Sequence, residues 1–380
     1  MSHPALVEPV DELDLTELAR YSRHLSLPGI GVQGQRRLAN ARVLVVGAGG
    51  LGSPIANYLI AAGIGHLTVI DPDTVELSNL QRQIMHRERD AGRAKVDSVT
   101  RLADDLNARV RVHALQERLD ATNAVQLFAE HDLVIDGSDN FSTRYLSNDA
   151  AEITGTPLVW GTIFQFSGQV SVFDPRHGAM LRDLFPEIPD ADSVPSCAEG
   201  GVLGALCGIV GSMMATEALK LITGAGHPLT GRLWLYDALE ATTRVLSFTR
   251  DPGRAAVHEL VEQPAPTCAV SAGQELDPLT LEALRTPAML VVDVRQGWER
   301  ELAQIPGSVW VPLEQLLEHG WSALPLAAEH VVFVCKSGVR SLRAVRHLNA
   351  LELHPELSIY SLRGGTLGWL AQVEGKLVTY

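Results

Sequence analysis

The sequence predicts an α/β protein of two domains, the first with a mixed, mainly parallel sheet and the second smaller. Three observations support this. The chain has 380 residues, about two and a half times the length of a typical domain. Apolar residues 43–46 pass into Gly47-Ala-Gly-Gly-Leu-Gly52, the pattern of a buried parallel strand, a tight turn and a helix. A second apolar strand, residues 331–334, runs into Cys335-Lys-Ser-Gly-Val-Arg340.

Composition excludes several classes of protein. The formal net charge of -14 argues against a nucleic-acid surface. The N-terminus lacks the basic and apolar regions of a signal peptide, and the apolar residues 200–215 are too few for a membrane span. We therefore expect a cytoplasmic protein whose four cysteines are reduced.

The glycine turn predicts a nucleotide site in a Rossmann-like domain. Gly49 and Gly50 allow a ligand to approach the backbone where a Cβ would collide. A helix over residues 53–62 ends at Gly63, a strand follows over residues 67–70, and Asp71 stands where a ribose-binding acid is expected. To this point, packing alone or a dinucleotide dehydrogenase would explain the turn equally well.

The residues after Asp71 favour ATP. Amide and cationic side chains follow it closely, and a triphosphate needs fixed positive charge more than a nicotinamide dinucleotide does. Further on, apolar residues 132–135 end in Asp136-Gly-Ser-Asp139-Asn140, at the sheet edge where open α/β folds bind ligands. Asp139 could hold Mg²⁺ against the phosphates or cap the next helix. The predicted nucleotide-binding residues are Gly49, Gly50, Asp71, Asp73, Ser78, Asn79, Gln81, Arg82, Lys95, Asp139 and Asn140.

The remaining elements of the first domain follow in order. Residues 14–24 predict a helix ahead of the first strand. Residues 83–131 predict helix, strand (109–114) and helix (123–130), as a doubly wound sheet requires. Strands over residues 158–161, 168–173 and 231–237 follow, two of them with the alternation of antiparallel additions. Cys197 lies among small polar residues before a buried helix, which predicts an accessible thiol, whereas Cys207 is predicted to pack.

The motifs GAGGLGS, DPDTVELSNLQRQ, GRAK and DGSDNFSTR resemble those of the MoeB/ThiF adenylyltransferases, which activate ubiquitin-like sulfur carriers, over residues 15–262. The resemblance implies that Asp139 serves ATP and magnesium and that Cys197 bonds to the carrier's C-terminus. It also implies that Arg23 reaches the partner subunit's ATP site, and hence a homodimer.

One feature departs from that family. Relatives carry two Cys-x-x-Cys pairs that hold a structural zinc, whereas this chain has Met180-Leu-Arg-Asp183 and Ala265-Pro-Thr-Cys268. One thiolate cannot form a tetrahedral site, so we expect no structural zinc.

The second domain begins after a linker. Residues 263–277 contain prolines, a glycine and small polar residues, so we assign residues 1–262 and 278–380 to the two domains. Cys335 ends a buried strand and is followed by a glycine-bearing loop and a helix, whose N–H donors, with Lys336 and Arg340, stabilise a thiolate. The loop is one residue shorter than the phosphate loop of cysteine phosphatases, and it resembles the active loop of a rhodanese sulfurtransferase.

Together the two resemblances imply one enzyme. ATP and Mg²⁺ would adenylate the C-terminal glycine of a Gly-Gly sulfur carrier, with Arg23, Arg82 and Lys95 offsetting phosphate charge. A persulfide on Cys335, loaded by thiosulfate or a cysteine desulfurase and flanked by Arg340, would then supply sulfur, and Cys197 would release the carrier thiocarboxylate. The alternatives are a dinucleotide-dependent oxidoreductase with a persulfide module and a non-catalytic carrier-binding scaffold.

Overall fold

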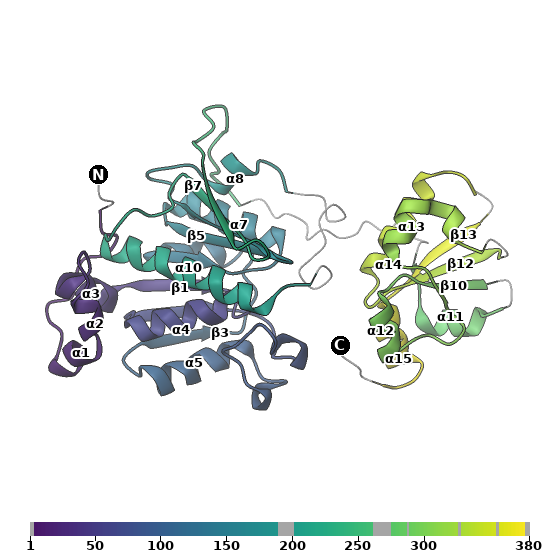
Figure 1. Ribbon diagram of the computed structural model, residues 1–380, viewed down its shortest axis with the longest axis horizontal. Coiled ribbons are helices and arrows are strands. Elements are labelled where there is room, and N and C mark those ends of the chain that lie inside the picture. Colours follow the sequence, from purple (N-terminus) through teal and green to yellow (C-terminus); the bar gives the residue numbers. More distant parts are fainter. Residues whose placement is uncertain are drawn as a thin grey trace. The chain divides into compact units, whose positions relative to one another are not determined.

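The computed structural model describes residues 4–188, 201–260, 275–286, 289–325, 328–354 and 357–376. The chain divides into two compact units, Met1–Ala265 and Pro266–Tyr380 (Figure 1). Most of the predicted linker lies outside the described residues, so the predicted domain bounds 1–262, 263–277 and 278–380 stay predictions.

The N-terminal unit contains an eight-stranded sheet in the order β3-β2-β1-β4-β5-β6-β7-β8. The first five strands along this order are parallel, and the last three are antiparallel to their neighbours. This confirms the predicted mixed, mainly parallel sheet. The strands are β1 (Arg42–Val46), β2 (His66–Ile70), β3 (Arg111–Leu115), β4 (Leu133–Asp136), β5 (Leu158–Phe164), β6 (Ser167–Phe173), β7 (Arg232–Asp237) and β8 (Thr242–Ser247).

Helices cover both faces of this sheet because successive residues of β1 point to opposite sides. Val43 and Val45 join the apolar cluster of α4 and α10, whereas Leu44 and Val46 join that of α6 and α7. The helices are α1 (Leu15–Arg20), α2 (Ser22–Leu25), α3 (Gly31–Asn40), α4 (Gly52–Ala62), α5 (Lys95–Leu106), α6 (Ala124–Ala129), α7 (Phe141–Thr154), α8 (Leu181–Leu184) and α10 (Gly204–Thr223), with short 3-10 helices at η1 (Leu77–Asn79) and η2 (Glu88–Asp90).

The structure corrects several predicted elements. The N-terminal helix is broken at Tyr21, whose buried ring lies against Gly63 and whose hydroxyl accepts a hydrogen bond from Asn107 at 2.8 Å. The predicted strand over residues 109–114 begins at Arg111. Helix α3 and strand β8 were not predicted; every residue of β8 is exposed, so it lacks the buried face that marks a strand in a sequence.

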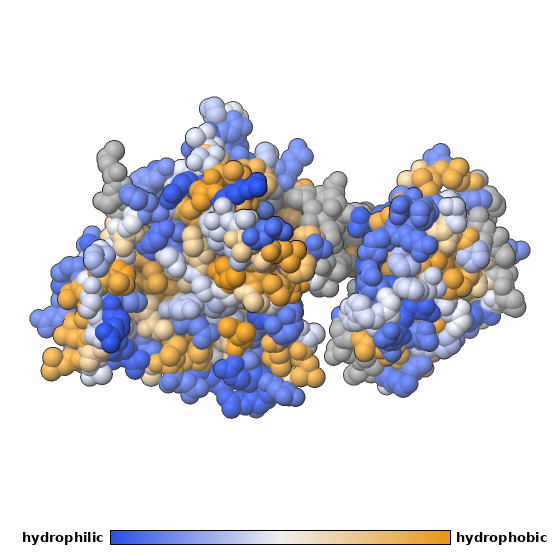
Figure 2. Space-filling view, viewed as in Figure 1, coloured by the Kyte–Doolittle hydropathy of each residue, from blue (hydrophilic) through white to orange (hydrophobic). Residues whose placement is uncertain are grey.

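Helix α10 is long and apolar enough to span a membrane by length and composition. It packs instead against α4, α3 and β5 in the core, where Leu206, Cys207 and Val210 are fully buried. Ile209 on the same helix stays 41% exposed, and Figure 2 shows hydrophobic residues interspersed with hydrophilic ones on the visible face. The helix is therefore a core helix with one partly uncovered side.

The C-terminal unit contains a parallel five-stranded sheet in the order β11-β10-β12-β13-β9. Its faces bury separate clusters, one with α13 and α14 and the other with α11 and α15, which confirms a second α/β domain. The elements are β9 (Glu275–Leu276), α11 (Pro278–Leu284), β10 (Met289–Asp293), α12 (Gly297–Leu302), β11 (Val309–Trp310), α13 (Leu313–His319), η3 (Gly320–Ala323), β12 (His330–Val334), α14 (Val339–Ala350), β13 (Ser358–Leu362) and α15 (Gly365–Gln372).

Candidate active sites

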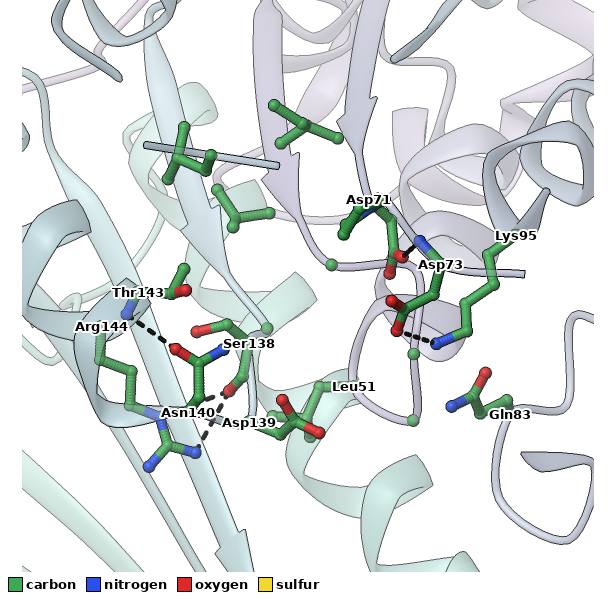
Figure 3. A pocket seen from close by; sticks show the side chains of 18 of the residues that line it. Leu51, Asp71, Asp73, Gln83, Lys95, Ser138, Asp139, Asn140, Thr143 and Arg144 are labelled. Carbon is green, nitrogen blue, oxygen red and sulfur yellow. Dashed lines mark hydrogen bonds and ion pairs between the residues drawn. The ribbon is translucent and has the colours of Figure 1, made fainter. Parts of the chain in front are cut away.

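A cavity of about 300 Å³ opens at the carboxyl ends of β1, β2 and β4 (Figure 3). The strand order reverses between β1 and β4, so the connections after these two strands leave toward opposite faces and part there. Open α/β sheets bind ligands at such a switch point. Figure 3 shows Asp71, Asp73 and Lys95 on one side of the cavity and Asp139 and Asn140 on the other.

The glycine turn forms one wall of the cavity. Gly47 adopts a φ of 93°, and a Cβ at Gly52 would lie 2.0 Å from the Gly47 carbonyl oxygen. Both positions therefore require glycine. Asp71 at the end of β2 holds the turn, because its Oδ2 accepts a hydrogen bond from the Ala48 N–H at 2.7 Å.

The second wall carries paired charges. Lys95, at the start of α5, is buried, and its Nζ lies 2.9 Å from Asp73 Oδ2. Burial raises the pKa of Asp71, although Lys95 and the N–H groups of Ala48 and Asp73 oppose this rise. The cation, with Arg82 at the same cavity, provides the fixed positive charge that a polyphosphate requires.

Asp139 is free to act on a ligand. The sequence left open whether it caps α7, but Asn140 is the cap, since its Oδ1 accepts a hydrogen bond from the Thr143 N–H at 2.9 Å. Asp139 is exposed and makes no hydrogen bond or ion pair with any residue that the structure describes. A single free carboxylate beside a phosphate site fits Mg²⁺, which keeps several waters and takes its other ligands from the phosphates.

Most of the predicted nucleotide-site residues line this cavity, and three do not. Asn79 is buried and its Oδ1 accepts a hydrogen bond from the Glu76 N–H at 3.3 Å. The Ser78 carbonyl accepts one from Arg82 Nη1 at 3.1 Å, and the backbone of Gln81 lies against Gly204 of α10. Those that line the cavity are Gly49, Gly50, Asp71, Asp73, Arg82, Lys95, Asp139 and Asn140.

Sequence reasoning missed several lining residues. Arg144 is buried and donates to the Ser138 carbonyl at 3.2 Å through Nη2. It stands within the quoted motif DGSDNFSTR, so the motif could have indicated it. Arg118 follows β3, whose carboxyl end lies at the same sheet edge, and this position was the signal for it. The lining residues not predicted include Gln83, Arg118, Ser138, Thr143 and Arg144.

Two further residues of the first domain were predicted to be functional. Arg23 on α2 is exposed, does not line the cavity, and makes no hydrogen bond or ion pair with the described residues. Cys197 lies outside the described residues. Their predicted roles stay predictions.

In the C-terminal unit, Cys335 follows β12, and its side chain is buried in the loop that precedes α14. Its Sγ accepts hydrogen bonds from the Gly338 N–H at 3.1 Å and from Ser341 Oγ at 3.4 Å. The loop rests on the turn at Gly365, where a Cβ would lie 2.3 Å from the Cys335 carbonyl oxygen. The Thr366 N–H donates to that same carbonyl at 2.7 Å. This loop can therefore stabilise a negatively charged sulfur.

Arg340, predicted to act on the Cys335 sulfur, forms an ion pair with a glutamate. Its Nη1 and Nη2 lie 2.7 and 2.6 Å from the two carboxylate oxygens of buried Glu299 on α12. The ion pair ties α12 to the Cys335 loop. The predicted catalytic role of Arg340 stays a prediction, and the contact with Glu299 indicates a role in positioning the loop.

The two described positions that were compared with zinc ligands, Met180 and Asp183, make other contacts. Met180 packs into an apolar cluster, and Asp183 is engaged by Arg254, whose Nε lies 2.7 Å from Asp183 Oδ1. Ala265 and Cys268 lie outside the described residues. Within the described part of the chain, no group of three or more His, Cys, Asp or Glu residues could hold a metal ion.

Comparison with known proteins identifies both units. The model of the ThiF family matches residues 21–255, and the model of the rhodanese-like domain matches residues 279–372. The chain belongs to the ThiF family. This ThiF protein is 44% identical to the probable adenylyltransferase/sulfurtransferase MoeZ of Mycobacterium tuberculosis, over 100% of this chain and 99% of that protein.

Other relatives agree with this assignment. The adenylyltransferase and sulfurtransferase MOCS3 of Aedes aegypti is 36% identical over 98% of this chain and 91% of its own length. A sulfur carrier protein adenylyltransferase of Thermus thermophilus is 52% identical over 62% of this chain and 89% of its own length. Among solved structures, E. coli MccB has a TM-score of 0.57 at 19% identity, covering 64% of this chain and 75% of MccB, which shows the fold alone. The ThiF protein described here is an adenylyltransferase and sulfurtransferase.

Proposed function

We propose that this ThiF protein uses ATP and Mg²⁺ to adenylate the C-terminal glycine carboxylate of a ubiquitin-like, Gly-Gly sulfur carrier and then replaces AMP with sulfur. The adenylation step is supported by the position of Lys95 and Asp139, which line the same cavity. Activation is necessary because a free carboxylate has no leaving group. Attack of the carboxylate on the α-phosphorus forms the acyl-adenylate and releases pyrophosphate, while Lys95, Arg82 and a partner's arginine offset the charge. Asp139 would hold Mg²⁺.

The Cys335 loop carries the second half. The terminal sulfur of a Cys335 persulfide attacks the acyl carbon and displaces AMP, leaving an acyl disulfide between the carrier and Cys335. A thiolate at Cys197 then attacks the Cys335 sulfur, which releases the carrier thiocarboxylate and leaves a Cys197–Cys335 disulfide for an external thiol to reduce. Thiosulfate or a cysteine desulfurase would load Cys335. A homodimer in the cytoplasm completes the proposal.

Two substitutions separate the half-reactions. Adenylation needs no thiol, so Cys335→Ala should keep ATP–pyrophosphate exchange near the wild-type rate while abolishing sulfur transfer from thiosulfate and thiocarboxylate formation. Arg82→Ala should abolish exchange and leave sulfur transfer from thiosulfate intact, so each variant is the control for the other. Thiocarboxylate formed at the normal rate by Cys335→Ala, without added sulfide, would show that another residue carries the sulfur.

Cys197 acts last in this scheme. Cys197→Ala should leave both half-reactions unchanged and slow only the release of the thiocarboxylate, because the acyl disulfide forms only after both have run. Dithiothreitol should restore turnover by taking over the thiol exchange. A loss of pyrophosphate exchange in Cys197→Ala would contradict this order.

A further inference from the structure

The peptide groups on either side of Ala48, in the glycine turn, are held by two side chains from outside the turn. Asp71 accepts from the Ala48 N–H at 2.7 Å, and the ring Nε2 of His86 lies 2.9 Å from the Ala48 carbonyl oxygen. A carbonyl oxygen only accepts hydrogen bonds. Nε2 of His86 must therefore carry a proton and donate it to Ala48.

The surroundings of His86 define its state. The ring is 3% exposed, and burial, with a smaller effect of the Lys95 charge, lowers the pKa of His86 despite the hydrogen bond to Ala48. A neutral ring with its proton on Nε2 has a bare Nδ1. That atom is buried without a hydrogen-bond partner among the described residues, so the bond to Ala48 is the one hydrogen bond of this ring there.

This hydrogen bond fixes the direction of a second group. The peptide between Ala48 and Gly49 is planar and trans, so its C=O and N–H point in opposite directions. The carbonyl points to His86, which is not among the residues that line the cavity, whereas Gly49 lines it. The Gly49 N–H therefore points away from His86, and it has no hydrogen-bond partner among the described residues.

The turn fixes this peptide only in part. Gly49 and Gly50 have no side chains to restrict φ and ψ, and Ser53 donates to the Gly49 carbonyl, at 2.9 Å from its N–H and 2.8 Å from Oγ, rather than to the Ala48 carbonyl. An outside donor must hold the peptide if its N–H is to meet a ligand without a cost in conformational entropy. His86 belongs to the turn segment that also carries Arg82 and Gln83, which line the cavity. Its hydrogen bond to Ala48 therefore connects this segment to the glycine turn.

We propose that His86 is a positioning residue of the adenylation site: through the Ala48 carbonyl it directs the Gly49 N–H at a phosphate oxygen of the bound nucleotide. The inference rests on the proposed placement of ATP in this cavity. It adds to that proposal a residue that touches neither substrate.

Two substitutions of similar length test the hydrogen bond. In His86→Gln the amide Nε2 stands as many bonds from Cβ as the Nε2 of histidine and can donate to Ala48, whereas His86→Met has no donor. From the net free energy of one hydrogen bond, we expect His86→Met to raise the KM for ATP in pyrophosphate exchange about three- to tenfold, and the Kd for ATP by the same factor. The change in kcat should be smaller than the change in KM. His86→Gln should restore most of the affinity.

Comparing the affinities for two ligands distinguishes a positioning role of His86 from a general loss of structure in the cavity. The affinity of His86→Met for adenosine, which has no phosphate, should equal that of the wild type, since the Gly49 N–H has no partner in that complex. His131→Met is the matched control: it removes hydrogen bonds to Leu127 and Thr68 from a histidine outside the cavity lining, and its KM for ATP should be that of the wild type.

Several outcomes would overturn the inference. These are a wild-type KM for ATP in His86→Met, equal losses in the Gln and Met variants, or equal losses of ATP and adenosine affinity. If His86→Met does not fold, ¹⁵N NMR of the wild-type ring decides, because a proton on Nδ1 instead of Nε2 excludes the bond to Ala48. Failure of the proposed function would be seen in a different variant. If the cavity does not bind ATP, Lys95→Met should leave pyrophosphate exchange unchanged, whatever the results for the His86 variants.

Discussion

At the scale of single residues, the chemistry of the C-terminal unit depends on how the sulfur of Cys335 is solvated. Its side chain is almost completely buried, so water cannot stabilise a negative sulfur there. Among the described residues, the Gly338 N–H and the Ser341 hydroxyl donate hydrogen bonds to it. Hydrogen bonds to a charged acceptor are stronger than those between neutral groups.

We therefore expect Ser341→Ala to lower kcat/KM for sulfur transfer from thiosulfate about tenfold, since one hydrogen bond to a charged group is lost. Ser361→Ala is the matched control, because Ser361 Oγ lies 2.8 Å from Ser341 Oγ and contacts the Gly338 carbonyl but not the sulfur. The measurement is the rate of sulfur transfer from thiosulfate to cyanide. Equal losses in both variants would indicate that Ser341 acts through loop packing alone.

At the scale of elements, Arg254 connects two helices near the end of the first unit. It pairs with Asp183 on α8, and its Nη1 lies 2.9 Å from Glu152 on α7. Burial alone would raise the pKa of Asp183, but hydrogen bonds from Arg254 and from the Met180 N–H hold it below its usual value of 3.8. This ion pair network includes Asp183, one of the positions compared with zinc ligands.

Removing the cation should be costly. Arg254→Met leaves the carboxylates of Asp183 and Glu152 without their counter-charge, so we expect a loss of about 3–5 kcal/mol in the free energy of unfolding. Arg109→Met, whose ion pair with Asp14 is about half exposed, should lose less than about 1 kcal/mol. Urea unfolding of the full chain measures both.

The same reasoning predicts no structural zinc. Elemental analysis should find no zinc, and a chelator should leave the melting temperature unchanged, because the described residues offer no ligand set. About one zinc per chain would show that residues outside the described part bind it.

The ion pair between Glu299 on α12 and Arg340 predicts that the stability of the C-terminal unit depends on pH. Burial alone would raise the pKa of Glu299, but the hydrogen bond and charge of Arg340 hold it below its usual value of 4.5. A lowered carboxyl pKa adds stability that is present above 4.5 and is lost as the pH falls through the folded-state pKa. The unfolding transition of the C-terminal unit should therefore shift to lower temperature below pH 4.5.

Calorimetry of the full chain tests this dependence. Glu299→Gln should be less stable at neutral pH and should show a smaller acid shift, because the titrating group is gone. A wild-type acid shift that persists unchanged in Glu299→Gln would assign it to other carboxyl groups.

At the scale of the whole molecule, the proposed homodimer makes a prediction about Arg23. Arg20 is bound within its own chain, where Nη1 donates to the Leu106 carbonyl at 2.9 Å. Arg23, three residues later, is exposed and makes no contact of this kind with the described residues. Because Arg23 has no partner among the described residues, we propose that it serves a neighbouring copy of the chain.

Mixing experiments should reveal this sharing. Arg23→Ala and Lys95→Ala homodimers should both lack exchange activity, and random reassortment should recover about a quarter of wild-type activity, since half of the dimers are mixed and each mixed dimer has one intact site. Arg20→Ala should be active without mixing. Mixed dimers without activity would rule out a role across the interface.

The sequence by itself determined the features that depend on local spacing. Alternation and apolar runs located the parallel strands of the first sheet, and the glycines after residue 46 located the turn, because steric limits on φ and ψ act within a few residues. Six of the eleven predicted nucleotide-binding residues lie within four residues of the end of a parallel strand, and their place at the sheet edge follows from the parallel order. The same reasoning placed Cys335 at the end of β12.

Only the tertiary structure decided which side chains meet across long stretches of chain. His86 binds Ala48, Arg254 binds Asp183, and Arg340 binds Glu299, each pair between 38 and 71 residues apart. Asn79, predicted to bind the nucleotide, is buried and does not line the cavity in this structure, and its role stays a prediction. Side-chain direction and partner depend on how whole elements pack, and residue spacing within one segment carries no record of that packing.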